Sequence, residues 1–414
     1  MSNPSSRDIA TNQSDLYDHL LSPTAIRERT QRLHQLTRDG AGRFIIDEKQ
    51  WQATVDFVLQ VIRASYPDLD VPFHSRWGHI QAGGSDRLAL LNRQLAGQDA
   101  VERARTKIDT VVVSVLLDAG AGPTWAYHEE NRRFNRSEGL AVAAYHLSRQ
   151  GTFSSNAAAQ PWRVDGERLQ RLSRAELEKG FQVSDTNPLT GVEGRLGLLN
   201  QLGAVLQQNR DRFPDARPGN LLDTLRAHHG DGFSATDLLR AVLEGFGPIW
   251  PSRLTLNGQP LGDVWHHPSL GAVDNPDALV PFHKLSQWLT YSLIEPIREA
   301  GFAVPGVENL TGLAEYRNGG LFVDMGVLVP RDESVVQRHH SPDSELIVEW
   351  RALTLCLLDR MVTDIQQALG LSAENFPAAK VLEGGTWRAG RIIAAQKRED
   401  ASPPIKLASD GTVF

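Results

Sequence analysis

The amino-acid sequence predicts a mainly α fold: one large helical unit with a few short strands and hairpins. Apolar residues recur at helical spacing in most segments of the 414-residue chain, and strand-like patterns are confined to short runs. The motifs of common cofactor enzymes do not occur: there is no Walker loop, no GxGxxG after a strand, no GxSxG, no HExxH and no CxxC. We therefore expect long helices to form the core and polar loops to carry the function.

Composition narrows the possible classes of function. The net charge of −7, with acidic and basic residues mixed along the chain, argues against a nucleic-acid-binding surface. The single cysteine, Cys356, excludes a disulfide framework, and we expect it to be inert core in a reducing compartment. No signal peptide and no membrane-spanning apolar run is recognisable. We expect a cytoplasmic protein that does not bind membranes, with residues 1–20 flexible and residues 21–414 forming one compact domain.

In the first third of the chain, helices are predicted by apolar spacing and by the residues that begin and end them. Residues 22–38 begin at a Ser-Pro pair and stop before a glycine, and residues 48–65 end before a Tyr-Pro pair. Residues 88–95 and 98–107 also have helical spacing. The apolar run at residues 110–117 fits either a buried strand or a buried helix, and we predict a helix.

Further helices are predicted from the middle of the chain onward. One begins near Gly191, because Thr190 and Glu193 have the spacing of a capping box. The others are expected at residues 235–243, 279–301 and 344–369. A proline inside the second of these predicts a kink.

Short extended segments account for other parts of the second half. An Asn-Gly turn within residues 247–268 predicts a β-hairpin. The apolar run that follows the glycine pair at residues 319–320 is expected to be strand-like. The tail from residue 387 onward is predicted to be strand-like or extended, and to lie over the body of the protein.

The best site candidate is the polar loop of residues 179–191, which carries Asp185 and runs directly into a predicted helix. The N-terminus of a helix has unpaired N–H groups and a partial positive charge, which can hold an anion or keep a nearby carboxylate ionised. A capped surface helix explains the same pattern equally well for Asp185, and explains it better for Glu193.

A second candidate is the segment of residues 71–87, in which functional side chains are unusually dense. Arg76 offers a planar fork for carboxylate, phosphate or vicinal hydroxyls, and Trp77 offers a flat face for a sugar or a planar group. A buried Trp77 with Arg76 as its surface partner is an equally good interpretation. His74 and His79 lack an acidic partner at metal-ligand spacing, so a metal site is weakly indicated.

Acidic residues in other loops complete the set of candidates. Asp118 opens a glycine-rich turn that ends at Trp125, and Ser137 is the expected cap of a helix with Glu138 in its first turn. An acid inside an apolar run is costly to bury unpaired, so Asp324 is expected to meet Arg317 or a ligand.

Carboxylates surrounded by arginine and tryptophan suit the hydrolysis of a glycosidic bond. In that reaction one acid stabilises an oxocarbenium-like centre or orients water, and another group protonates the leaving group. The same side chains also suit simple binding of a polar metabolite. Long helices with loop-borne polar residues are also found in helical base and nucleoside glycosylases, an analogy of fold that does not establish function.

Several longer motifs extend this interpretation. They are VPFHSRWGHIQAGGSDR, SVLLDAGAGPTW, RSEGLAVA, FQVSDTNPLTGVEGRLGLLNQLG, RPGNLLDTL, LVPFHKLSQWLTYSLIEP, EYRNGGLFVDMGVL and the closing DGTVF. In this order, and over nearly the whole chain, the sequence resembles the uracil catabolism protein 4 family of fungi and bacteria. The resemblance implies one compact unit and a place in a uracil-degrading route. The other enzymes of that route resemble GTP cyclohydrolase II and uracil phosphoribosyltransferase, and its intermediates include ribosylurea-type compounds.

The residues and the resemblance together lead to one hypothesis: a cofactor-independent hydrolase that cleaves the C–N bond between urea and ribose or a ribose phosphate. Asp185 is assigned the position at the reacting carbon, and Asp324 or Glu138 is the second acid. The side chains expected to hold or enclose the substrate are Arg76, Arg87, Arg195, Trp77, Trp125 and Trp288. Further candidate binding residues are His74, Asp86, Asp118, Glu193, His283, Glu315 and Arg317.

Two alternatives belong to other classes of function. A non-catalytic partner of the cyclohydrolase-like pathway enzyme predicts a large exposed apolar patch and no deep polar pocket. A metal-dependent amidohydrolase acting on the urea fragment predicts bound metal. Its ligands would come from His74, His79, His266, His267 or His283. None of the histidine spacings indicates a metal site, so we expect no metal and no cofactor.

Overall fold

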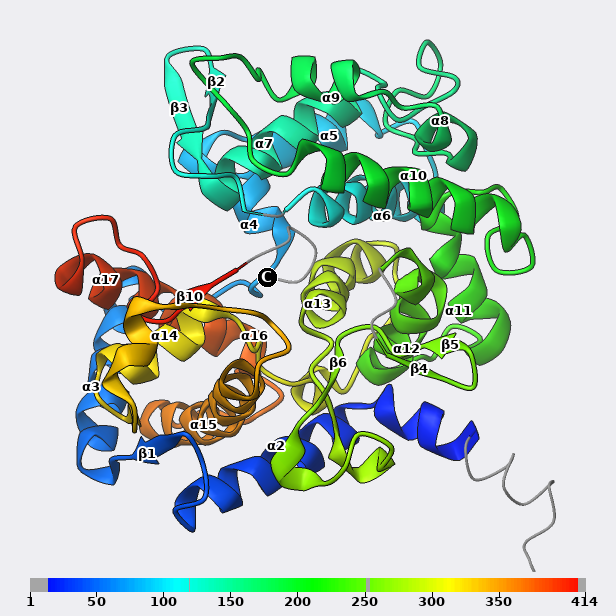
Figure 1. The fold of residues 1–414 in the computed structure, drawn as a ribbon. Helices are drawn as coiled ribbons and strands as arrows, with labels where there is room; N and C mark the ends of the chain where they lie inside the picture. The colour runs from blue at the N-terminus through cyan, green and yellow to red at the C-terminus, as the bar shows by residue number, and fades with distance from the viewer. Residues whose placement is uncertain (1–13, 119, 251–253, 409–414) are drawn as a thin grey trace, which may run out of the picture. The chain divides into compact units, whose positions relative to one another are not determined.

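The computed structural model describes residues 14–118, 120–250 and 254–408. Within these residues, helices form nearly all the regular structure, and strands occur only in two-stranded pairs (Figure 1). The predicted mainly α fold is confirmed. Residues 14–20, which belong to the segment predicted to be flexible, are helical. The closing DGTVF motif and the first thirteen residues lie outside the described residues.

The chain forms two compact units. Unit 1 contains the described parts of residues 1–74, 252–287 and 306–409, and unit 2 contains the described parts of residues 75–251 together with residues 288–305. None of the helices in the described residues combines the length and the apolar character needed to cross a membrane.

Unit 1 is built around the 25-residue helix α15 (Glu345–Leu369). Its buried residues, which include Ile347, Trp350, Met361 and Ile365, recur at helical spacing. The helices packed against it are α2 (Pro23–Arg38), α3 (Trp51–Ser65), α14 (Tyr316–Asp324) and α16 (Ala378–Val381) (Figure 1). A π-helical turn, Leu382–Thr386, joins α16 to α17 (Trp387–Lys397), which packs against α14.

The strands of unit 1 are short. The antiparallel pairs are β1 (Phe44–Ile46) with β8 (Leu328–Pro330), β4 (Thr255–Leu256) with β5 (Gln259–Pro260), and β6 (Val264–His266) with β7 (Leu279–Pro281). The pair β9 (His339–His340) and β10 (Lys406–Leu407) is parallel. The predicted Asn-Gly hairpin is the β4–β5 pair, and positive φ angles of 53° at Asn257 and 76° at Gly258 fit a type I′ turn.

In unit 2, helix α6 (Ala100–Leu116) packs against α4 (Arg76–Ile80), α7 (Arg136–Arg149) and α10 (Val192–Gln208). The other α-helices are α5 (Arg87–Gln94), α8 (Gly166–Gln170), α9 (Arg174–Gly180), α11 (Leu221–His229) and α12 (Ala235–Phe246). Strands β2 (Ala126–Glu129) and β3 (Arg132–Asn135) form an antiparallel hairpin. Helix α13 (Lys284–Glu299) contributes its first residues to unit 1 and the rest to unit 2.

Short 3-10 helices complete the regular structure. They are η1 (Glu48–Gln50), η2 (Ala82–Gly84), η3 (Pro218–Asn220), η4 (Gly247–Ile249), η5 (Pro268–Leu270), η6 (Pro276–Ala278), η7 (Val307–Asn309) and η8 (Glu333–Gln337).

The predicted helix at residues 110–117 is confirmed, but it is the second half of α6 and not a separate element. The predicted capping box is wrong. The N-cap of α10 is Gly191, whose φ of 74° is left-handed, and no side chain caps the helix. Ser137 is also not a cap, because α7 begins one residue earlier, after Asn135. The long helix predicted from residue 279 begins at Lys284, since the preceding residues form β7.

Two segments predicted to be extended are helical in their first part: the glycine pair and the residues after it lie in α14, and the start of the tail is α17. The second part of the first run does form a strand, β8, and the tail also contains the short strand β10. Both helices contain a glycine that lies where helices approach closely. A Cβ atom on Gly319 would lie 2.9 Å from the Trp350 ring, and one on Gly390 would lie 2.3 Å from the carbonyl oxygen of Arg317. Tertiary packing therefore explains glycines that local propensity assigns to turns.

Candidate functional site

Buried and half-buried polar side chains in unit 2 gather around Asp118, which follows the C-terminus of α6. The Ser137 hydroxyl, in the first turn of α7, lies 2.7 and 2.8 Å from the two carboxylate oxygens of Asp118. Nη1 of Arg76, from α4, lies 2.9 Å from the same carboxylate. His79, one turn further along α4, lies 3.0 Å from the Ser137 hydroxyl through its Nδ1. We call these four residues the Asp118 cluster.

The Ser137 hydroxyl links Asp118 to His79. It donates its one proton to the Asp118 carboxylate. Nδ1 of His79 lies 3.0 Å from the same hydroxyl oxygen and 3.5 Å from Nη1 of Arg76. The His79 ring also lies 5.5 Å from the ring of Trp288, with the two planes tilted by 55°. Ser137, Arg76 and Trp288 thus all contact His79.

Arg76 is completely buried. Its Nε donates to the hydroxyl of Ser114 at 2.8 Å, and its Nη1 faces Asp118 and Ser137. Within the described residues, its Nη2 has no hydrogen-bond partner. Burial lowers the pKa of Arg76, and the negative charges of Asp118 and Glu138 oppose that shift. Glu138 therefore contributes to the electrostatics of the cluster.

The segment of residues 179–203 holds the loop that carries Asp118. Arg195, fully buried in α10, donates from Nε to the carbonyl oxygen of Leu117 at 2.9 Å and from Nη2 to that of Gly120 at 3.1 Å. It also donates to the carbonyl oxygen of Thr190. Burial lowers the pKa of Arg195 to about 10. These bonds of Arg195 therefore hold the backbone before and after Asp118.

Asp185 lies on an exposed loop upstream of these contacts, and no described residue bonds to its side chain. Nearby, the Asn187 side chain bonds to the backbone N–H and carbonyl of Ala126, both at 2.9 Å. Glu193 is exposed and pairs with Arg174. The structure therefore places Asp185 and Glu193 at the surface of unit 2.

The remaining candidates of unit 2 make contacts that organise the fold. Trp77 is buried and donates to the carbonyl oxygen of Ser292 at 2.9 Å, and Trp125 donates to that of Phe181 at 2.9 Å. Asp86 caps α5. Arg87 is buried and pairs with Glu129, which also accepts from His146 at 2.6 Å.

Five candidates lie in unit 1. Glu315 caps α14 by accepting from the backbone N–H groups of Arg317 and Asn318, and the Arg317 side chain donates to the carbonyl oxygen of Ala401. His283 is buried and bonds to the carbonyl oxygen of Leu20 at 2.9 Å. The other two, Asp324 and His74, have side-chain partners that sequence reasoning missed.

The expected pairing of Asp324 with Arg317 is wrong. Asp324 accepts two bonds from Arg398, at 2.7 and 2.5 Å. His74 bonds through Nδ1 to Glu383 at 2.8 Å, and its ring lies 5.2 Å from that of Trp387. Glu383 lies just before α17, and Arg398 lies just after it. Because this segment was predicted to be extended, its sequence did not indicate where these two side chains would lie.

The five histidines of the metal alternative each bond to a protein group. His266 bonds to the carbonyl oxygen of Gly271 and His267 accepts from the N–H of Ser269, while His74, His79 and His283 have the partners given above. Within residues 14–118, 120–250 and 254–408, no group of three His, Cys, Asp or Glu side chains is arranged to hold a metal ion.

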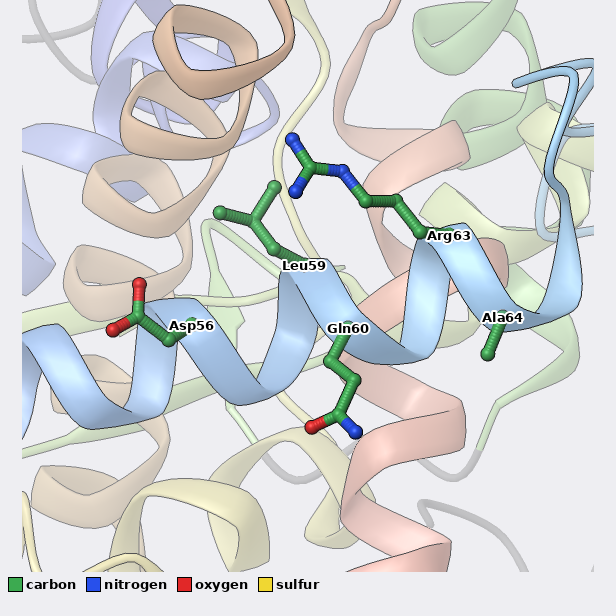
Figure 2. A pocket seen from close by; sticks show the side chains of 5 residues that line it. All are labelled: Asp56, Leu59, Gln60, Arg63 and Ala64. Carbon is green, nitrogen blue, oxygen red and sulfur yellow. The ribbon is translucent and has the colours of Figure 1, made fainter.

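Two surface hollows lie in unit 1, apart from the residues predicted for the site. One, of about 500 Å³, is lined by side chains of α3 alone, among them Asp56 and Arg63 (Figure 2). The other, of about 600 Å³, lies near the start of α15 and is lined by residues that include Arg43, Arg331 and Arg338. Arg43 pairs there with Glu345, and Arg338 pairs with Asp332.

Comparison with known proteins identifies the relatives of this chain. Residues 19–414 match the family model described as "Protein of unknown function (DUF1688)". The chain belongs to this family. It is 41% identical to Protein urg3 of Schizosaccharomyces pombe, over 95% of this chain and 98% of that protein. It is 40% identical to Uracil catabolism protein 4 of Lachancea kluyveri, with the same two coverages. The resemblance inferred from the motifs is confirmed.

Proposed function

We propose that this protein is a hydrolase of uracil catabolism that cleaves the N-glycosidic bond of a ribosylurea-type compound to urea and ribose or ribose phosphate. The pathway is supported by the name of its relative, Uracil catabolism protein 4, with which it shares 40% identity over 95% of the chain. The reaction is supported by one observation: the half-buried Asp118 and Ser137 meet the fully buried Arg76 beside Trp288.

Asp118 is the acid that this geometry favours at the reacting carbon. Departure of the urea nitrogen leaves positive charge on the anomeric carbon, and an ionised carboxylate stabilises that charge. The Arg76 guanidinium and the Ser137 hydroxyl both contact the Asp118 carboxylate. Glu138, next to Ser137 in α7, is the second acid of the proposal.

The reaction balances without a cofactor. Water adds its hydroxyl group to the anomeric carbon as the C–N bond breaks, and the displaced nitrogen leaves with a proton, forming ribose and urea. Asp185 remains a candidate for the first role, because its loop leads into the backbone that holds Asp118. Asp324 is not used in this proposal, since Arg398 engages both of its carboxylate oxygens in unit 1.

The test measures free urea after incubation of the purified protein with ribosylurea or its 5′-phosphate. Asp118→Asn and Glu138→Gln are expected to lower the rate by about a hundredfold or more, the usual size of a lost acid–base or charge-stabilising group. Glu193→Gln, which changes an exposed acid in the first turn of a neighbouring helix, is the matched control and should leave the rate unchanged.

Two further arms separate the alternatives. If Asp185→Asn abolishes turnover and Asp118→Asn does not, the carboxylate assignment is wrong although the reaction stands. Loss of activity with a chelator, restored by a divalent metal, would favour the amidohydrolase. No urea from either compound with folded protein would contradict the proposed reaction and favour a binding role.

A further inference from the structure

Arg76 has a buried hydrogen-bond donor that the fold does not satisfy. The side chain is fully buried, and its Nε and Nη1 have protein partners at 2.8 and 2.9 Å. Its Nη2 has none among the described residues. A buried donor of a charged group without an acceptor is destabilising, so buried polar groups of this kind are normally paired with a protein atom, a water or a ligand. The Nη2 of Arg76 therefore indicates a position for an oxygen atom.

The charges around Arg76 decide what kind of oxygen this is. Asp118 lies in contact with the guanidinium, and Glu138 adds a second negative charge nearby. A second buried cation, Arg195, interacts with Asp118 and Arg76 and donates to the backbone carbonyls before and after Asp118. The positive charge of Arg76 is thus already opposed by the negative charge of Asp118, with Glu138 nearby. A phosphate, which carries a charge of about −1.5 to −2 at neutral pH, would bring uncompensated negative charge next to Asp118. A neutral oxygen would not.

The surroundings of Arg76 favour a flat ligand group. The Cζ atom of Arg76 lies 5.5 Å from the centre of the Trp288 ring, and the His79 ring lies 5.5 Å from the same ring. Nη1 and Nη2 are attached to one carbon in the planar guanidinium, so an oxygen bound at Nη2 is a neighbour of the Asp118 carboxylate. A planar group with a carbonyl oxygen and adjacent N–H groups can accept from Arg76 and donate to a carboxylate at once. A ureido group has this pattern.

We propose that Nη2 of Arg76 binds the neutral carbonyl oxygen of a ureido group, so that the cluster recognises the urea end of its substrate and not a phosphate. This inference rests on the proposed function for the identity of the sugar, but not for the recognition of the ureido group. It makes Arg76 a specificity-determining residue of the Asp118 cluster.

Binding of compounds that cannot be hydrolysed tests the proposal separately from turnover. Ribitylurea and its 5-phosphate carry the ureido group on a methylene carbon, and ribose 5-phosphate carries the phosphate without the ureido group. Calorimetric affinities of the full chain for the three compounds are compared with those of Arg76→Lys, which keeps the charge beside Asp118 but lacks the planar fork. Arg174→Lys, at an exposed arginine, is the matched control.

The expected result is that Arg76→Lys weakens both ribityl compounds by a similar factor of about tenfold or more and leaves ribose 5-phosphate unchanged. A loss confined to the two phosphates would overturn the proposal and assign Arg76 to phosphate. Equal affinities in both proteins would also overturn it and assign a buried water to Nη2. Failure of the wild-type protein to bind either ribityl compound would also overturn the proposal.

A second readout covers the case in which Arg76→Lys does not fold. The carbonyl stretch of ¹³C-labelled ribitylurea should move to lower frequency when the compound binds the wild-type protein, because a guanidinium hydrogen bond polarises the C=O bond. An unshifted band in the bound state would contradict the proposal. If binding follows expectation but ribosylurea releases no urea, the proposed hydrolysis fails and the ligand assignment stands.

Discussion

Two buried arginines contact acids on or just after α6, and they differ in how completely their donors are used. Arg217 donates from Nε and Nη2 to Asp109, at 2.9 and 2.6 Å, and from Nη1 to Glu102 at 2.6 Å. Asp109 also accepts from the backbone N–H of Gly219 at 2.7 Å. Arg76, beside Asp118, leaves Nη2 without an acceptor among the described residues.

The difference separates an ion pair that stabilises the fold from one that is available to a ligand. Every nitrogen of the Arg217 guanidinium has an oxygen acceptor within the protein. Asp263 and Arg351 in unit 1 resemble that saturated pair, since two bonds of 2.8 and 2.7 Å join them and Arg351 stacks 4.0 Å from the Phe282 ring centre. Arg76 combines equal burial with an incomplete set of bonds, which indicates function.

The largest effect is expected where the pair is saturated. Arg217→Met leaves Asp109 buried without its counter-charge, and the free energy of unfolding should fall by about 3–5 kcal/mol. Urea denaturation followed by circular dichroism measures this loss. Adding Asp109→Leu to Arg217→Met removes the unpaired charge and should recover much of the stability. A single variant that loses less than about 1 kcal/mol would mean that water reaches Asp109.

The same comparison predicts that two acids connected with α6 behave in opposite ways. Asp118→Asn should reduce urea release by about a hundredfold or more while most of the protein stays folded. Asp109→Asn should lower stability strongly and leave the rate per folded molecule close to that of the wild type. Rates normalised to the folded fraction, measured by circular dichroism on the same samples, decide between these outcomes. Equal loss of rate in the two variants would remove the distinction between the pairs.

Acid sensitivity is predicted for the saturated pair of unit 1. Burial alone would raise the pKa of Asp263, but the Arg351 guanidinium and the N–H donors of Trp265 and Lys284 outweigh it and hold the pKa well below its ordinary value. The folded-state pKa is thus lower than the unfolded one. The stabilisation is therefore complete above the unfolded pKa of about 3.9 and is lost as the pH falls through the folded value.

Asp263→Asn tests this dependence. Between pH 5 and about pH 2, the free energy of unfolding of the wild type should fall more steeply than that of the variant, because only the wild type gains a proton at this position on unfolding. Denaturation curves at several pH values give the two slopes. Parallel slopes would show that Asp263 does not contribute to acid unfolding. Asp56→Asn, at an exposed acid of α3, is the control.

The sequence allowed prediction of those helices whose apolar face is long and regular, such as α2, α3 and α15. It did not allow prediction of α17, because Gly390 and the polar residues around it weaken the pattern, and the glycine is needed only for the close approach to Arg317. Helix α6 was correctly predicted over its apolar half although its β-branched residues favour a strand, since burial on all sides overrides that preference.

For the candidate site, the sequence pointed to Arg76 through its dense polar segment, to Asp118 through its glycine-rich turn, and to Glu138 through its place in the first turn of a helix. Nothing in it indicated that Asp118 and Ser137 are hydrogen-bonded, since they are 19 residues apart and lie on different elements. Ser114 lies inside an apolar run, and nothing in its sequence surroundings predicted its contact with Arg76. Asp185 was favoured for its position before a helix, a signal that exposed loops share with binding sites.

The smallest effect is expected for an exposed ion pair, that of Glu193 with Arg174. Glu193 pairs with Arg174 at 2.9 Å, but the side chains retain 66% and 59% of their exposure, so water and salt screen the interaction. Glu193→Ala should leave the midpoint of thermal unfolding and the rate of urea release unchanged, at both low and high salt. Differential scanning calorimetry at the two salt concentrations checks the first expectation. A clear fall in the midpoint at low salt only would contradict this expectation. It would show that the pair helps to hold α9 against α10. The pair would thereby support the loop that Arg195 fixes around Asp118.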